Sequence, residues 1–131
     1  MTYHKLRIFS GLVCGLLLLT ACEDSGPNGY PDHITINPEG TSIVVVGTAR
    51  IGRIHLQDAE FLPSYLQDDE TKVVNDTLFC QYRWLTAILP LGEKKILISA
   101  TPNDTGKKRK MWIECMMGPD FHEIFVTQLA K

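Results

Sequence analysis

Apolar and polar residues alternate with a period of two along most of the chain from His33 onward, and residues such as Pro38 and Gly40 interrupt the alternation at short intervals. Such runs predict half-buried β-strands separated by turns. The expected strands cover residues 34–37, 42–46, 53–57, 72–74, 80–84, 95–100, 111–117 and 122–129. Residues 61–70 are less regular and predict a loop. Because no segment keeps a helical period, the pattern predicts an all-β sandwich of about seven strands.

The two tryptophans fall on strand faces of different character. Trp84 shares its face with Cys80 and Tyr82, so it is expected to pack in the core. Trp112 shares its face with Glu114, opposite the apolar face of the same strand, and is the better candidate for an exposed ring. An exposed ring is a platform on which a sugar can stack, whereas a half-buried tryptophan under a loop is the alternative.

The first 22 residues have the pattern of an export signal. His4, Lys5 and Arg7 precede an apolar run over residues 8–19, which is shorter than the roughly 20 residues of a membrane-spanning helix. The run ends in Leu19-Thr20-Ala21-Cys22, which resembles the lipobox of bacterial lipoproteins. In such a box the cysteine thiolate takes on the lipid and becomes the first mature residue. The alternative is an ordinary signal peptide that carries a cysteine at this position by chance.

This interpretation divides the chain into a signal peptide over residues 1–21, a flexible tether over 22–33 and a domain over 34–131. The tether begins with Glu23 and Asp24 and is rich in glycine and proline, which do not build a packed element. Acidic residues directly after the cysteine resemble the signal that sends lipoproteins of Bacteroidetes to the cell surface. The expected location is the outer membrane, with the membrane bound through lipid on Cys22.

Charge and cysteine content refine this picture. After loss of residues 1–21 the chain has eleven Lys and Arg against fifteen Asp and Glu, a formal charge of −4, which gives no reason to expect a nucleic acid partner. Cys80 and Cys115 lie on apolar strand faces assigned to one core. In an oxidising compartment they are candidates for a disulfide, and two buried thiols are the equal alternative.

The last third of the chain carries a family resemblance. Asn103-Asp104-Thr105-Gly106-Lys107-Lys108-Arg109 follows the apolar strand 96–100 and precedes the strand 111–117, and the chain ends in Val126-Thr127-Gln128. This succession resembles the BACON domain family, which also carries a tryptophan at the place of Trp84. Residues 34–38 resemble the opening of that family, and residues 57–78 look like an insertion. The resemblance implies an immunoglobulin-like β-sandwich with a role in glycan or mucin binding, or in spacing other parts from the membrane.

Three further features carry candidate chemistry. Lys107, Lys108, Arg109 and Lys110 form a basic run at an expected hairpin tip, which is either a solvated turn or a site for sulfated or acidic polysaccharide. Gly106 is expected in a left-handed turn position. Asp76-Thr77-Leu78 matches a short acceptor sequence for O-glycosylation at Thr77.

Motifs of catalysis, phosphate binding and metal binding are absent from the sequence, and His33, His55 and His122 are far apart along it. We therefore expect neither an enzyme nor a cofactor nor a metal. Two classes of function remain. One is a non-catalytic module that binds a glycan or a protein at the cell surface, and the other is a spacer or accessory subunit that docks onto another envelope protein. An exposed aromatic row favours the first, and an apolar patch or unpaired edge strand favours the second.

Overall fold

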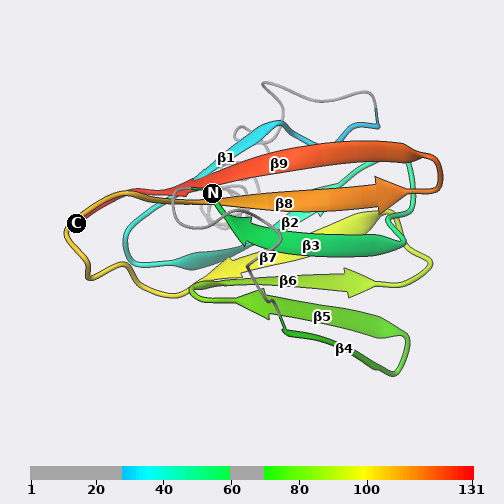
Figure 1. Cartoon of the computed structure of the whole chain (residues 1–131), viewed down its shortest axis with the longest axis horizontal. Helices are drawn as coiled ribbons and strands as arrows, with labels where there is room; N and C mark the ends of the chain where they lie inside the picture. Colours follow the sequence, from blue (N-terminus) through cyan, green and yellow to red (C-terminus); the bar gives the residue numbers. More distant parts are fainter. Residues whose placement is uncertain (1–27, 60–69) are drawn as a thin grey trace, which may run out of the picture.

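The computed structural model describes residues 28–59 and 70–131, which form nine β-strands in two packed sheets (Figure 1). The strands are β1 (His33–Ile36), β2 (Thr41–Val46), β3 (Arg53–Asp58), β4 (Glu70–Val74), β5 (Thr77–Tyr82), β6 (Leu85–Pro90), β7 (Lys95–Ala100), β8 (Arg109–Met117) and β9 (Asp120–Gln128). This part of the chain contains no helix. The predicted all-β sandwich is confirmed, with nine strands in place of about seven.

The order of the strands is that of an immunoglobulin-like sandwich. One sheet has the order β1-β9-β8-β3, and the other has the order β2-β7-β6-β5-β4. Strands β3, β8 and β9 correspond to the C, F and G strands of the immunoglobulin fold, and β2, β7 and β6 correspond to its B, E and D strands. β1 pairs parallel to β9, while the other paired strands are antiparallel.

The core lies between the sheets because each strand turns its alternate apolar side chains inward. β6, β7 and β8 show this most clearly, with buried and half-buried residues in strict alternation along most of their length. The largest fully buried side chains are Tyr30, Ile34, Ile36, Ile51, Leu56, Leu85, Leu89, Ile96, Ile98, Met111, Ile113 and Ile124. Both sheets contribute to this set, so neither is stable in this form without the other.

The middle of the chain departs from the expected strands. The strand expected over residues 80–84 ends at Tyr82, where Arg83 adopts a positive φ of 53° and the chain reverses into β6. Trp84 therefore lies in a turn and not on a strand face, although it is buried as expected. Asn75 and Asp76, at φ 48° and 59°, form the tight turn between β4 and β5. The two strands form a hairpin that extends the sheet beyond β6, in the region that the sequence indicated as an insertion.

The predicted tether extends too far along the chain. Residues 22–33 were expected to be free of the domain, but Tyr30 is fully buried and Pro31 is buried as well. The Tyr30 hydroxyl donates to the carbonyl of Ala49 at 2.7 Å, and the amide of Thr48 donates to the carbonyl of Asn28 at 2.8 Å. The packed domain therefore includes residues from Asn28 onward, and residues 22–27 lie outside the described part.

Candidate ligand-binding site

An aromatic row crosses the outer face of the four-stranded sheet. The pairing register places His33 of β1 opposite Phe125 of β9, Phe125 opposite Trp112 of β8, and Trp112 opposite Gln57 of β3. The rings of Trp112 and Phe125 are 4.4 Å apart between centroids, and His33 meets Phe125 edge-on at 5.4 Å. Trp112 and Phe125 are half-buried, and His33 is exposed. The row presents a continuous aromatic surface over three adjacent strands.

The next positions along the same face carry polar groups. Glu123 of β9, Glu114 of β8 and His55 of β3 lie opposite one another in register, one rung from the aromatic row. A hollow of about 480 Å³ opens beside them and is lined by Arg53, His55 and Glu114 together with parts of β4 and β5. An aromatic surface bordered by hydrogen-bonding groups is the usual composition of a site for a polar ligand.

Gln57 ends the aromatic row with an unused acceptor. Its Oε1 is buried and has no hydrogen-bond partner within the described part of the chain. Most buried polar atoms in folded proteins do have a partner. A hydroxyl donor that reached this end of the row would satisfy this acceptor.

The basic run does not form a single charged patch. Arg109 occupies an inward position of β8 at the end of the sandwich, where its guanidinium lies 4.8 Å above the ring of Trp84. Lys110 faces outward on the same side as Trp112, while Lys107 and Lys108 are exposed in the turn. The structure thus separates the four cations that the sequence places side by side. Only Lys110 lies next to the aromatic row.

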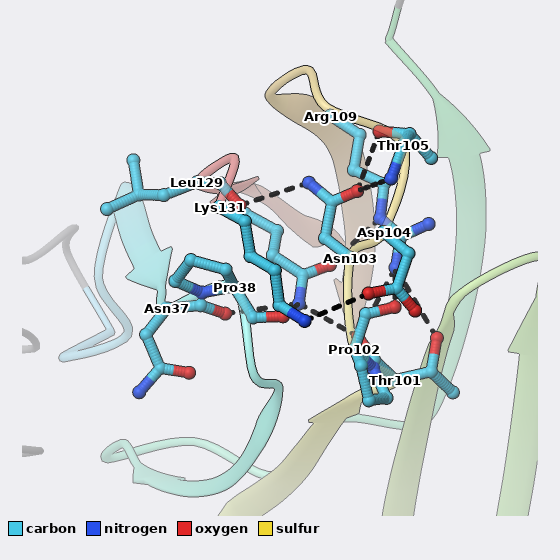
Figure 2. A network of polar contacts seen from close by, with 11 residues as sticks. Asn37, Pro38, Thr101, Pro102, Asn103, Asp104, Thr105, Arg109, Leu129 and Lys131 are labelled. Atoms are coloured by element: carbon cyan, nitrogen blue, oxygen red, sulfur yellow. Dashed lines mark hydrogen bonds and ion pairs between the residues drawn. The ribbon is translucent and has the colours of Figure 1, made fainter.

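Arg109 is part of a structural network and not a solvated side chain, contrary to expectation. Its Nε donates to Oε1 of Gln128 at 2.8 Å, and its Nη2 donates to the carbonyls of Pro102 and Thr101 at 3.0 and 3.2 Å (Figure 2). Burial lowers the pKa of Arg109 from its ordinary value, and the nearby Asp104 carboxylate opposes that shift. The guanidinium therefore stabilises the fold and is not a ligand-binding group.

Asn103 is the centre of the turn before Arg109. It is fully buried, and its amide donates to the carbonyls of Lys107 and Leu129 at 2.8 and 3.0 Å. Its Oδ1 accepts from the amide and the hydroxyl of Thr105 (Figure 2). Gly106 follows at φ +80°, which confirms the left-handed position expected for it. The Asn-x-Thr-Gly-x-x-Arg pattern therefore joins the turn to the end of the chain.

The outer face of the five-stranded sheet carries a second surface, which is apolar. Val44, Leu97, Ile88 and Phe79 lie opposite one another across four strands, and Lys72 of β4 continues the rung. Val44 is 47 % exposed and the next three are half-buried. All five residues of β4 are exposed, and among the described strands β4 pairs only with β5.

Cys80 and Cys115 are buried, reduced thiols on opposite sheets and are not joined as a disulfide. Burial, with a smaller contribution from Glu114, raises the pKa of Cys115 to about 12. The thiol of Cys80 accepts a hydrogen bond from Thr71 at 3.5 Å. The second of the two alternatives therefore describes this structure, and both residues serve as core side chains.

The remaining predicted sites have separate places. Thr77 begins β5, half-buried, with its hydroxyl bonded to the carbonyl of Asn75 at 3.5 Å. Cys22 lies outside the described residues. His122 is buried against the carbonyl of Pro31 at 3.0 Å, so it does not meet His33 or His55. Within residues 28–59 and 70–131, His, Cys, Asp and Glu form no group of three that would hold a metal ion.

The sequence indicated Trp112 but not the other members of the row, which are His33, Phe125 and Gln57. The signal that would have found Phe125 is the Gly118-Pro119 pair between two long strands. It predicts a hairpin in which Trp112 and Phe125 are equidistant from the turn and hence opposite each other. His33 and Gln57 come from strands distant in the sequence, so their register depends on the whole sheet.

These observations define an all-β immunoglobulin-like sandwich with an aromatic row on one outer face and an apolar rung on the other.

No family model matches the chain. No curated protein matches it either. Among solved structures, the NMR structure of a protein from Bacteroides thetaiotaomicron is similar, with a TM-score of 0.47 and 10 % identity over 83 % of this chain and 85 % of that chain. A similarity of this size assigns neither a family nor a function. Within the described residues, no helix is long and apolar enough to cross a membrane.

Proposed function

We propose that this protein is a lipid-anchored, non-catalytic binding module of the bacterial cell envelope, held at the outer membrane through Cys22. Its ligand is a glycan that stacks on the aromatic row formed by His33, Phe125 and Trp112. The observation that carries the proposal is this row, because three adjacent strands place rings on one outer face. Glu114 and Glu123 on the next rung supply acceptors for sugar hydroxyls, which suits a neutral glycan rather than a sulfated one.

The anchor is tested with Cys22→Ala. We expect this variant to accumulate as an uncleaved or soluble precursor that no longer partitions into detergent. Normal membrane retention of the variant would contradict lipid attachment at this residue.

The ligand is tested with Trp112→Ala in the soluble domain, residues 28–131, on a glycan array followed by titration with the glycan found. We expect binding to fall by at least about tenfold, because aromatic contacts are dominant in such interfaces. Phe79→Ala is the matched control, since Phe79 is a half-buried ring on the outer face of the other sheet. Unchanged binding by a folded Trp112→Ala protein would exclude the row as the site.

The alternative function is docking onto another envelope protein through the five-stranded sheet. The apolar rung from Val44 to Phe79 favours it, and so does the outer edge of β4, which pairs with no described strand. For this function Leu97→Asp should remove the protein from its complex in detergent extracts, while Trp112→Ala should leave the complex intact. The opposite pattern would favour the glycan-binding function.

A further inference from the structure

The chain reaches the domain at one end of the sandwich, which we call the tether end. It comprises residues 28–31, 46–53, 91–94 and 116–121. Backbone hydrogen bonds join these segments: Thr48 to Asn28, Gly47 to Lys94 and Gly52 to Met116. Figure 1 shows the β4–β5, β6–β7 and β8–β9 turns at this end and the C-terminus at the opposite end.

The tether end exposes a concentration of apolar side chains. Phe121 is 53 % exposed and Met116 is 40 % exposed, and the two are paired across the β8–β9 hairpin. Val46 and Leu91 are exposed at the same end, on the side of the five-stranded sheet. Together they make up half of the eight large hydrophobic side chains exposed in the described residues. Scattered apolar side chains are ordinary on a surface, but a group at one end indicates a contact.

The length of chain outside the structure limits how far this end can lie from the membrane. Five residues lie between Cys22 and Asn28, the first described residue, so six Cα-to-Cα steps join the two. An extended chain spans at most about 3.5 Å per residue, so this segment reaches about 20 Å. A lipid on Cys22 would therefore hold the tether end close to the bilayer and leave the end with the Asn103 turn pointing away.

We propose that the tether end rests on the lipid bilayer, with Phe121 and Met116 at the level of the headgroups. This inference depends on the lipid attachment proposed above. Arg53 lies opposite Met116, but the exposed charges here have both signs, with Arg50 and Lys94 against Glu93 and Asp120. The contact therefore depends on apolar side chains and not on anionic lipid. The sheets then stand upright on the membrane, and the aromatic row faces sideways into solution.

The experiment uses the lipidated full chain in phosphatidylcholine vesicles that carry a quencher on the headgroup. Asp120→Cys, beside Phe121, takes a fluorescent label, and Asp104→Cys is the matched control, since both aspartates are exposed and lie at opposite ends. Cys80 and Cys115 are buried and remain unlabelled in the folded protein. We expect quenching at position 120 to exceed that at 104 several-fold and to persist at high salt.

A second comparison isolates the apolar contact. In the Asp120→Cys background, Met116→Ser with Phe121→Ser should lower quenching at position 120 several-fold, whereas Val44→Ser, at an exposed apolar position on the sheet face, should leave it unchanged. Equal quenching at 120 and 104, or quenching that survives the double substitution, would overturn the inference. Label–label self-quenching at 120 without lipid quenching would also overturn it, in favour of a second copy of the chain. Failure of the protein to stay with the vesicles would instead contradict the anchor.

Discussion

Asn103 shows how one side chain holds two segments of this protein together. The residue is fully buried, both of its donor hydrogens and its acceptor are used, and its partners lie in the turn and at the C-terminus. Gln128 has a similar role. Its side-chain amide donates to the carbonyls of Asn37 and Thr101, and its Oε1 accepts a hydrogen bond from Nε of Arg109. The polar side chains of a turn that was a candidate binding site are thus hydrogen-bonded within the protein.

Asn103→Asp is expected to destabilise the domain by about 3 kcal/mol or more, because a carboxylate would face two carbonyl oxygens in a buried position. Urea unfolding followed by tryptophan fluorescence measures the change. Asp104→Asn is the control, since Asp104 makes an exposed ion pair with Lys131 at 3.1 Å and should change stability by less than about 1 kcal/mol. Similar effects of the two substitutions would contradict the role given to Asn103.

Cys115 and Tyr30 predict a loss of stability in alkaline solution. Burial raises the pKa of each to about 12, from ordinary values of 9.0 and 10.0. Because the folded-state pKa is higher than the unfolded one, the stabilisation is complete below pH 9 and is lost as pH rises from 9 toward 12. Each group contributes a slope of at most about 1.4 kcal/mol per pH unit. Thermal melts between pH 7 and 11 test this, and Cys115→Ala should reduce the slope above pH 9.

At the scale of elements, β4 is the least protected strand of the five-stranded sheet. Every residue of β4 is exposed, and among the described strands only β5 pairs with it. β5, in contrast, buries Leu78 and Cys80 and is paired on both sides. The strand is held by one ladder of hydrogen bonds and by little apolar burial.

We therefore expect the amides of β4 to exchange with solvent by local opening, well before those of β5 and β6. Hydrogen exchange followed by NMR or mass spectrometry measures the order. Strand β2 is the matched comparison, because it is also an edge strand but buries Ile43 and Val45, and it should exchange more slowly. Equal protection of β4 and β2 would show that burial does not control local stability here.

At the scale of the whole molecule, Tyr30 connects the segment before β1 to the loop between β2 and β3. Its ring fills the space beside Gly47, where an added Cβ would lie 2.2 Å from a ring carbon. The carbonyl of Asp32 then accepts from the amide of Phe125, which brings the same segment to the aromatic row. The orientation of the domain on its tether is thus set by packing.

Tyr30→Ala should lower the free energy of unfolding by about 3–5 kcal/mol, as expected for removal of a fully buried aromatic ring. Gly47→Ala should also destabilise, because the tyrosine ring must move to admit a methyl group. Chemical denaturation of both variants measures the losses. Glu39→Ala, at an exposed position in the turn after β1, is the control and should be neutral. A Tyr30→Ala protein as stable as the parent would show that residue 30 does not contribute to the packed domain.

The sequence alone determined the class of fold and most of the strands, because alternation with a period of two is a local property that the sandwich respects. It also placed Trp84 inside and Gly106 in a left-handed turn. It did not determine the turn at Arg83 and Trp84, since a positive φ at arginine is rare and carries no turn signal. Nor did it separate the four basic residues, whose directions depend on the register of β8.

Only the tertiary structure decided what Tyr30, Arg109 and the aromatic row do. Tyr30 lies among glycine, proline and acidic residues, a composition typical of a linker. Its burial depends on the space beside Gly47, a residue distant in the sequence. No local sequence pattern assigns a role to Arg109. Its contacts with Gln128 and Trp84 form only when distant parts of the chain pack together. His33, Phe125 and Trp112 become one surface because parallel pairing of β1 with β9 joins the two ends of the chain, a long-range contact that local periodicity does not encode.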